Sequence, residues 1–402
     1  MLNLGKSLMR VLMITREHPP FIVGGVGKHT FYLAKYLRKK GLYVKVVSFG
    51  DPRLSSEEVL FVEPRSSIVS REGRRVNEDF KVPVDIARFT RVAISLLKGG
   101  EFDIVHVQEP YVGGLISYKH KVTTIHDTSF GEVKSYLKYF ESGSLKRIAF
   151  YFLAGYFMEF ASIATSKIII NPSPDVAWEM RKVYGVPQEK IRVIPNGVEE
   201  PDIREPDKLT AKRTLKIPED YFVIFTTAQH VARKRLETLV KAARVLKDGG
   251  FKNFIVIIGG GGPLSEYLKR LVVEVNVQDV VWLVGWIPDG ELPIYYRAAD
   301  VFVVTSEYEA GPLTLLEAGI REVPLIVSNV PSGFMMIARD GVDCLKFRLG
   351  DASDLAKKII TLRNDDSLLK RLSRSARVFA SMFRWDRIAE KTIATYREVL
   401  SS

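Results

Sequence analysis

The chain has 402 residues, 46% of them hydrophobic and 10% aromatic, which is enough to build two globular domains of about 200 residues each. Its single cysteine, Cys344, excludes a disulfide framework and a thiolate zinc site, and its six histidines fall at no recognised metal-ligand spacing. The formal net charge of +12 favours acidic ligands or surfaces, but no nucleic-acid-binding module accompanies it, so we expect no nucleic acid partner.

The first half of the chain alternates short apolar runs with helix-like stretches, which is typical of parallel sheets built from βαβ units. Residues 1–8 hold one lysine and no long apolar core, so we expect no signal peptide and a cytoplasmic protein. The expected strands are 10–15, 43–48, 103–108, 121–125 and 167–170. The charged stretch between residues 50 and 99 is expected to carry one or two short elements, which the pattern does not place.

A glycine-rich loop containing Gly24 and Gly25 follows the first expected strand and opens a basic helix over 28–40. Backbone N–H groups in such a loop can approach a diphosphate, while a tight turn is the alternative explanation. The glycine spacing does not fit the classical dinucleotide fingerprint, which disfavours hydride transfer. The basic face is explained by solvation, by a groove for an acidic ligand, or by contact with anionic lipid.

Two further features of the first half bear on function. His126 follows the expected strand 121–125, so it can hydrogen-bond a sugar hydroxyl from the carboxyl end of a parallel strand; a structural histidine is the alternative. The most apolar stretch, 148–164, carries Glu159 and is shorter than the roughly 20 residues of a membrane span. We therefore expect a core helix there rather than a membrane-contacting one.

The second half restarts the alternation, with expected strands at 221–227, 253–258, 280–284, 301–305 and 325–328 and helical sequence from 354 to 400. The turn residues and charges of 195–202 predict the boundary. We expect two doubly wound α/β domains, 1–198 and 199–383, with a C-terminal helix at about 384–402 that packs back across the hinge, and a ligand between the domains.

Basic residues and glycines follow the strands of the second half. Arg233, Lys234 and Arg235 form a cationic cluster after the strand 221–227, where cations can neutralise a diphosphate. Gly262 lies in a later strand-to-helix turn, and Ile287 follows the strand after that one. Each of these signals is weak when taken alone.

The segment 306–318 places two glutamates, Glu309 and Glu317, eight positions apart across a strand-to-helix turn. A helix is expected to begin near Leu313, so its free N–H groups and positive dipole end can hold phosphate. The glutamates would flank that phosphate and accept hydrogen bonds from paired sugar hydroxyls. The alternative is a solvated Glu309 and an ordinary helical Glu317.

The order of these features resembles the retaining glycosyltransferases of the GT-B fold, specifically glycosyltransferase family 4, over almost the whole chain. The matching pieces are Gly24-Gly25, His126-Asp127, Pro195-Asn196-Gly197-Val198, Lys234, Gly260-Gly261-Gly262-Pro263, the segment 309–317 and the Trp385 tail. The resemblance implies two Rossmann-like domains facing across a cleft, with the nucleotide sugar held mainly by the second and the acceptor by the first.

The resemblance also implies roles for individual residues. Glu309 and His126 would be the catalytic residues, since both would contact the transferred sugar. The implied donor-binding residues are Gly25, Arg233, Lys234, Gly262, Ile287, Gly311, Leu313, Thr314 and Glu317. No metal and no cofactor are implied, because the nucleotide diphosphate sugar is a substrate and its diphosphate is stabilised by cations and helix N-termini.

The sequence therefore predicts a retaining, metal-independent transferase that moves a hexose from a nucleotide diphosphate sugar to a hydroxyl of a glycan, a lipid-linked acceptor or a small molecule. Two alternatives stay open: a GT-B nucleotide-sugar epimerase, and a nucleotide-sugar-binding protein without turnover. Gln229 and Pro312, where relatives commonly carry arginine and glycine, favour the second alternative. The basic charge also predicts a peripheral version of the transferase on an anionic membrane surface, on the inner face of the membrane.

Overall fold

The computed structural model describes residues 8–21, 24–64, 83–99, 102–138 and 144–402. The chain forms two compact units. Unit 1 comprises Met1–Leu137, Gly143–Gly197 and Trp385–Ser402, and unit 2 comprises Lys138–Ser142 and Val198–Arg384.

Unit 1 is built on a seven-stranded parallel sheet in the order β3-β2-β1-β4-β5-β6-β7. Its strands are β1 (Arg10–Ile14), β2 (Tyr43–Phe49), β3 (Val59–Val62), β4 (Ile104–Val107), β5 (Lys121–Thr124), β6 (Ile168–Asn171) and β7 (Ile191–Val193). Its helices are α1 (Gly25–Lys39), α2 (Pro83–Lys98), α3 (Pro110–Gly113), α4 (Ser129–Lys138), α5 (Ser144–Phe150), α6 (Tyr156–Thr165), α7 (Pro174–Lys182) and α16 (Trp385–Ser401). Short turns of helix are η1 (Pro52–Leu54), the π-helical η3 (Tyr151–Gly155) and η4 (Gln188–Lys190).

Unit 2 is built on a six-stranded parallel sheet in the order β10-β9-β8-β11-β12-β13. Its strands are β8 (Phe222–Thr227), β9 (Phe254–Gly259), β10 (Val281–Gly285), β11 (Val301–Val304), β12 (Leu325–Ser328) and β13 (Leu345–Phe347). Its helices are α8 (Lys208–Thr214), α9 (Leu236–Asp248), α10 (Ser265–Glu274), α11 (Leu292–Ala298), α12 (Leu313–Ile320), α13 (Gly333–Ile337), α14 (Ala352–Asn364) and α15 (Asp366–Ser381), with the 3-10 turn η5 (Ala232–Lys234).

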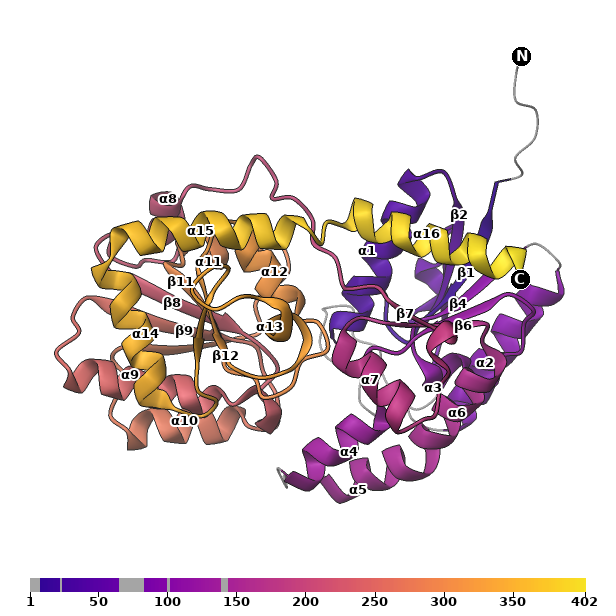
Figure 1. Ribbon diagram of the computed structural model, residues 1–402, viewed down its shortest axis with the longest axis horizontal. Coiled ribbons are helices and arrows are strands. Elements are labelled where there is room, and N and C mark those ends of the chain that lie inside the picture. The colour runs from indigo at the N-terminus through magenta and orange to yellow at the C-terminus, as the bar shows by residue number, and fades with distance from the viewer. Residues whose placement is uncertain (1–7, 22–23, 65–82, 100–101, 139–143) are drawn as a thin grey trace, which may run out of the picture. The chain divides into compact units, whose positions relative to one another are not determined.

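Helices cover both faces of the sheet in unit 2, which explains why its strands are continuous apolar runs. On one face α9, α10 and α14 pack over side chains such as Ile224 and Val303, and on the other α11, α12 and α15 pack over Phe225 and Phe302. Figure 1 shows the two sets of helices on opposite sides of β8, β9 and β11. A parallel strand buried on both faces needs apolar side chains at every position. The expected α/β fold with two parallel sheets is confirmed.

The helix α16 completes unit 1, although it comes last in the chain. Trp385 is almost fully buried, and a Cβ at Gly197 would lie only 2.4 Å from its ring, so the backbone must be glycine there. The Tyr396 hydroxyl lies 2.6 Å from Nδ1 of His106 on β4. Figure 1 shows α16 running beside α1. The helix therefore belongs to the core of unit 1.

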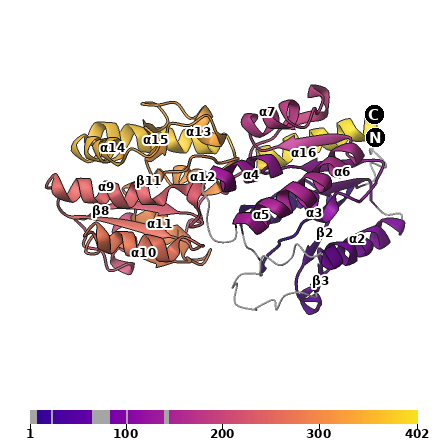
Figure 2. The ribbon, with the colours of Figure 1, turned by 90° about the horizontal axis from the view of Figure 1, so that it is seen from below.

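The apolar stretch 148–164 differs from its expectation as a core helix. It lies in a helix that runs without a break from α5 through η3 to α6, as Figure 2 shows. Met158 and Ile163 are buried, whereas the side chains of Phe152 and Phe157 are 67% and 63% exposed. The helix thus covers the core with one face and leaves large apolar side chains on the other. No helix in the described part of the chain is long and apolar enough to cross a membrane.

In each sheet, the order in which the chain adds strands changes direction at one place. In unit 1, β1 lies between β2 and β4, and in unit 2, β8 lies between β9 and β11. Open α/β sheets hold their ligands beyond the carboxyl ends of the strands at such switch points. The residues that follow β1, β4, β8 and β11 are therefore the first place to look for a functional site.

Candidate active site

Glu309 lies in the loop between β11 and α12, in unit 2, and only 7% of its surface is exposed. Its carboxylate Oε1 accepts hydrogen bonds from the Ser306 hydroxyl, at 2.7 Å, and from the Lys234 ammonium. Its backbone N–H donates to the Ser332 hydroxyl at 3.0 Å, and that hydroxyl donates to its carbonyl oxygen at 3.0 Å. Both the side chain and the main chain of Glu309 are therefore fixed.

The glycine that follows Ser332 permits this close packing of the main chain. Gly333 has a φ of 51°, and a Cβ there would lie 2.1 Å from the carbonyl oxygen of Glu309. A left-handed conformation in contact with another backbone leaves no room for a side chain. The loop after β12 therefore supports the loop after β11.

The cations next to Glu309 come from η5, which follows β8. Nη1 of Arg233 lies 3.7 Å from Oε2 of Glu309 and donates to the carbonyl oxygen of Tyr308 at 3.1 Å. The Thr305 hydroxyl donates to the carbonyl oxygen of Lys234 at 2.6 Å, which ties η5 to the end of β11. The adjacent strands at the switch point thus bring together Arg233, Lys234 and Glu309.

These cations also set the charge of Glu309. Burial by itself raises the pKa of this carboxyl, but the charges of Lys234 and Arg233 and the hydrogen bonds from Lys234 and Ser306 outweigh burial, so the pKa of Glu309 lies below its usual value. Glu309 is therefore ionised at neutral pH. An ionised carboxylate accepts hydrogen bonds from hydroxyl groups and does not donate.

Helix α12 begins at Leu313, where the sequence predicts it, and Pro312 occupies its N-cap. Gly311, Leu313 and Thr314 surround this helix start and are partly exposed. The first N–H groups of a helix have no partner within the helix, and they carry its positive dipole end. Glu317, one turn further on, is partly exposed, and its Oε2 accepts a hydrogen bond from the Tyr296 hydroxyl at 2.8 Å.

The loops after β9 and β10 lie beside the loop after β8. A Cβ at Gly262 would lie 2.6 Å from the carbonyl oxygen of His230, and a Cβ at Gly260 would lie 1.9 Å from that of Ala228, so both positions require glycine. Ile287 is buried, and its Cδ1 occupies the space in which a Cβ of Gly259 would sit at 2.6 Å. Gly262 and Ile287 thus lie at the same sheet edge as Glu309.

In unit 1 the corresponding switch point carries charged side chains. Gly25 is the exposed first residue of α1, and Gly24 before it donates its N–H to Oε2 of Glu17 at 2.7 Å. Arg16, two residues after β1, forms ion pairs with Glu17 at 2.9 Å and with Glu109, after β4, at 3.2 Å. The glycine loop is therefore anchored by a buried carboxylate.

His126 lies just beyond β5 in unit 1, within a cluster of histidines. Its Nε2 is 3.4 Å from Oε1 of Gln108, and its ring meets that of His29 edge-on at 4.6 Å. His29 in turn lies 2.8 Å from Oδ1 of Asn196. Burial, followed by the charge of His106, lowers the pKa of His126 to about 3. The imidazole is therefore neutral at pH 7, with one nitrogen that donates and one that accepts.

Several supporting residues are not evident from the sequence. Ser306 and Ser332 hold Glu309, Gln108 lies next to His126, and Glu17 anchors the glycine loop. Ser306 could have been found from its position three residues before Glu309, but no local signal links Ser332 or Gln108 to the site. Within the described ranges, no group of three or more His, Cys, Asp or Glu side chains could hold a metal ion.

Two family models match the chain. The model for glycosyltransferase family 4 matches residues 23–200, and the model for glycosyl transferases group 1 matches residues 207–379. An uncharacterized glycosyltransferase of Methanocaldococcus jannaschii is 24% identical over 402 residues, which cover 97% of this chain and 98% of the relative. The alpha-monoglucosyldiacylglycerol synthase of Streptococcus pneumoniae is 28% identical over 251 residues, which cover 60% of this chain and 54% of the relative.

Solved structures share the fold over almost the whole chain. Sucrose-phosphate synthase from Thermosynechococcus elongatus superposes with a TM-score of 0.78 at 21% identity, covering 98% of this chain and 99% of that one. HepE of Anabaena, solved in complex with UDP-glucose, gives a TM-score of 0.73 at 16% identity, covering 97% and 100%. At these identities the likeness shows the fold, which is GT-B.

Proposed function

Because the chain belongs to the glycosyltransferases of group 1 and family 4, which transfer sugar from a nucleotide sugar, we propose that it moves a hexose to a hydroxyl acceptor with retained anomeric configuration. The observation that carries the proposal is the fixed, ionised Glu309 between two cations and the N-terminus of α12. Such a site offers acceptors for sugar hydroxyls next to donors for a diphosphate. Unit 2 would hold the donor, and unit 1 would hold the acceptor.

In the proposed reaction the bond between the anomeric carbon and the diphosphate oxygen breaks, and a bond from that carbon to the acceptor oxygen forms. Lys234, Arg233 and the first N–H groups of α12, at Leu313 and Thr314, stabilise the negative charge that develops on the leaving diphosphate. The proton of the acceptor hydroxyl leaves with the departing phosphate or with solvent. Electrostatic stabilisation of the leaving group is therefore the main catalytic contribution of these residues.

The remaining residues orient the two parts of the donor. Glu309 accepts hydrogen bonds from hydroxyls of the transferred sugar, and Glu317 accepts them from the ribose. In unit 1, the neutral His126 offers one hydrogen-bond donor and one acceptor to a hydroxyl group, and Gly25 is exposed at the start of α1. Gly262, Gly311 and the backbone of Ile287 border the nucleotide. The structure of HepE with UDP-glucose supports a hexose donor, since it carries such a nucleotide sugar on the same fold.

A donor panel tests the proposal directly. Purified protein is mixed with UDP-, GDP- and ADP-hexoses, first in water and then with lipid-linked and soluble acceptors, and nucleotide release is measured. We expect Glu309→Gln to lower transfer by about 100-fold or more, the scale of a lost transition-state contact. The matched control is Glu274→Gln, an exposed glutamate on α10.

The outcomes separate the alternatives. Donor binding by calorimetry without release on any acceptor would support the binding protein, which Gln229 and Pro312 also favour. An epimerised sugar instead of a glycoside would support the epimerase. Full activity of Glu309→Gln would remove the observation on which the transferase rests.

We also infer a peripheral association with anionic membranes. Phe152 on η3 and Phe157 on α6 expose large apolar side chains, and Lys134 on α4 is exposed. Helices α4 and α6 are adjacent, because the N–H of Ser129 donates to Glu159 at 2.7 Å. Apolar side chains beside lysines are typical of interfacial helices. The alpha-monoglucosyldiacylglycerol synthase of Streptococcus pneumoniae, by name a lipid glycosylating relative, supports a lipid-linked acceptor.

A further inference from the structure

The carboxylate of Glu317 accepts a hydrogen bond from a buried tyrosine. Tyr296, on α11, is 1% exposed, and its hydroxyl donates to Oε2 of Glu317 at 2.8 Å. Burial, followed by the charge of Glu317, raises the pKa of Tyr296 well above its usual value, so the hydroxyl keeps its proton and remains a donor. A carboxylate that receives a hydrogen bond on one oxygen has a defined orientation.

Arg321, the residue after α12, supports the same pair. Its guanidinium carbon lies 5.4 Å from the centre of the Tyr296 ring, and its Nη1 donates to the backbone carbonyl of Glu317 at 2.9 Å. A guanidinium stacked on an aromatic face keeps that ring in place. The ring and the helix end that carries Glu317 are therefore fixed to the same side chain.

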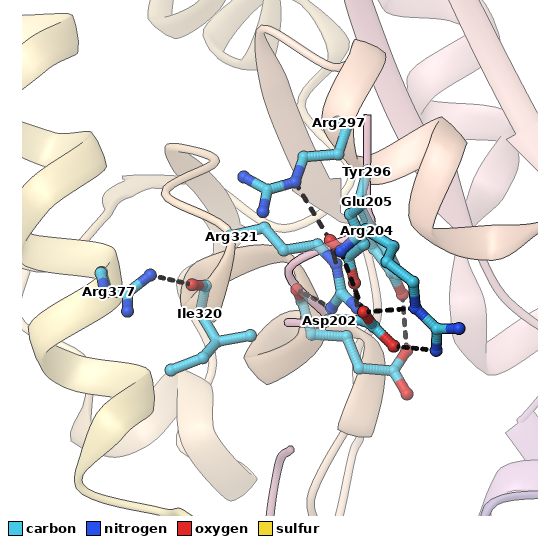
Figure 3. Close-up of polar contacts among 9 residues, drawn as sticks. Asp202, Arg204, Glu205, Tyr296, Arg297, Ile320, Arg321 and Arg377 are labelled. Atoms are coloured by element: carbon cyan, nitrogen blue, oxygen red, sulfur yellow. Dashed lines mark hydrogen bonds and ion pairs between the residues drawn. The ribbon is translucent and has the colours of Figure 1, made fainter. Parts of the chain in front are cut away.

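Arg321 is in turn held by Glu205, from the segment that precedes α8. Its Nε and Nη2 donate to the two oxygens of Glu205 at 3.0 and 2.6 Å, and Nε of Arg297 donates to Oε2 of Glu205 at 3.0 Å. Figure 3 shows Arg321 and Arg297 converging on this carboxylate. The side chains of Glu205 and Arg321 are only 6% and 11% exposed. Fork-shaped pairing of this kind fixes geometry as well as charge.

We propose that Tyr296 is a positioning residue that orients Glu317 toward the ribose hydroxyls of the donor, and that Glu205 locks this arrangement through Arg321. The inference rests on the proposed function, since it takes Glu317 as the ribose ligand. A carboxylate turned to face two neighbouring hydroxyls can accept from both, whereas a freely rotating one must be ordered on binding. The network therefore determines how well the site distinguishes a ribonucleotide from its deoxy form.

The experiment compares ribonucleotides with deoxyribonucleotides. Calorimetry first identifies which of UDP, GDP, ADP and CDP binds the intact protein best, and then measures its 2′-deoxy counterpart. We expect the wild type to prefer the ribo form by about 10-fold or more, the scale of a hydrogen bond to a charged group. Tyr296→Phe should reduce that preference at least threefold, roughly the effect of a weakened hydrogen bond, and leave deoxynucleotide affinity nearly unchanged.

Matched variants distinguish a loss of the hydrogen bond that orients Glu317 from a general loss of packing around Tyr296. Tyr295→Phe makes the same change on the neighbouring ring and should keep the wild-type preference. Glu205→Gln should reduce the preference in the same direction as Tyr296→Phe, because Arg321 loses its charged partner. If Tyr296→Phe also lowers the melting temperature strongly, Arg321→Lys gives a second reading, since lysine keeps the charge but lacks the fork.

The possible results lead to different conclusions. If folded Tyr296→Phe and Arg321→Lys both kept the wild-type ratio of ribonucleotide to deoxyribonucleotide affinity, Tyr296 would not be a positioning residue. The proposed donor site would be unaffected by that result. If the wild-type protein bound both forms equally, Glu317 would not be a ribose ligand, and this inference would fail although nucleotide binding itself would stand. If it bound no nucleoside diphosphate, the proposed donor site would fail, and this inference would fail with it.

Discussion

Lys234 and Glu309 neutralise each other in a place from which water is largely excluded, with 12% and 9% of their side chains exposed. A buried ion pair adds little stability by itself, but removing one partner leaves the other charged and poorly solvated. In the proposed reaction both residues also contact the donor. A change at this pair should therefore affect both the fold and the reaction.

The clearest residue-scale prediction concerns the cation. We expect Lys234→Met to lower sugar transfer by about 100-fold, because leaving-group stabilisation is lost. The same change should lower the free energy of unfolding by about 3 kcal/mol, because Glu309 keeps its charge with fewer partners. Nucleotide release and urea unfolding measure the two effects. Lys241→Met, on the exposed side of α9, is the matched control.

A double variant shows whether the two effects share a cause. Combined with Glu309→Gln, Lys234→Met should lose much less stability than it does alone, because the uncompensated charge is gone. Equal losses in both backgrounds would mean that the two side chains do not interact energetically.

At the residue scale, local sequence revealed the charged groups but not what holds them. The sequence singles out Lys234, Glu309 and Glu317 because they lie in recognisable segments that join a strand to the next helix or in the first turns of that helix. Ser332, Tyr296 and Glu205 could not, because their partners are distant in sequence and only the folded sheet brings them together. Hydrogen bonds of that kind leave no periodic pattern.

At the scale of elements, helices α4 and α6 are joined by one buried carboxylate. Glu159, on α6, accepts hydrogen bonds from the N–H of Ser129, at the start of α4, and from the Tyr184 hydroxyl. Burial raises the pKa of Glu159 to about 7, although these hydrogen bonds partly offset the shift. The folded protein therefore holds this proton more tightly than the unfolded chain does.

This shift predicts how the stability of unit 1 depends on pH. The contribution of protonated Glu159 is complete below the ordinary glutamate value of 4.5 and is lost as the pH rises through about 7. The side chain of Glu159→Gln cannot ionise. Between pH 5 and 8 the free energy of unfolding of the wild type should therefore fall by about 2 kcal/mol relative to that of this variant. Urea unfolding at several pH values measures the difference. Glu189→Gln, exposed on η4, should show no such trend, and a parallel pH profile for Glu159→Gln would refute the prediction.

Most of the described strands were predictable from the sequence, whereas the short strands β3, β7 and β13 were not. The sequence indicates β1, β2, β4 to β6 and β8 to β12, because buried parallel strands are continuous apolar runs. It misses β7 and β13, which have three residues each, and β3, whose four apolar residues lie in the charged stretch 50–99. The exposed face of the 144–165 helix was also missed, because composition alone does not show which side of a helix is covered.

At the scale of the whole molecule, charge and exposed apolar surface act together. With a net charge of +12, the protein should bind vesicles that contain anionic phospholipid at low salt. Raising the salt from about 50 to 300 mM should release most of it, because the screening length falls to a few ångströms. Co-sedimentation with vesicles measures the bound fraction.

A pair of substitutions tests the apolar part of this prediction. Phe152→Ser combined with Phe157→Ser should weaken binding at every salt concentration without changing nucleotide affinity, since both side chains are exposed in unit 1. The control is Val378→Ser, which removes an exposed apolar side chain on α15 in unit 2 and should leave vesicle binding unchanged. Phe334→Ser would not serve as a control, because that ring is buried and its loss would disturb the core. Equal sedimentation with neutral vesicles at both salt concentrations would contradict the electrostatic contribution.

The position of α16 in the chain affects how the protein is made. The ribosome synthesises the sheet of unit 1 first and then all of residues 198–384, and only afterwards Trp385, which fills the space beside Gly197. During synthesis unit 2 is therefore the first continuous unit to be complete. Unit 1 must wait for the last helix, with the apolar surface under α16 uncovered in the meantime. A released chain that is truncated before Trp385 should thus protect unit 2 from protease while unit 1 is cleaved.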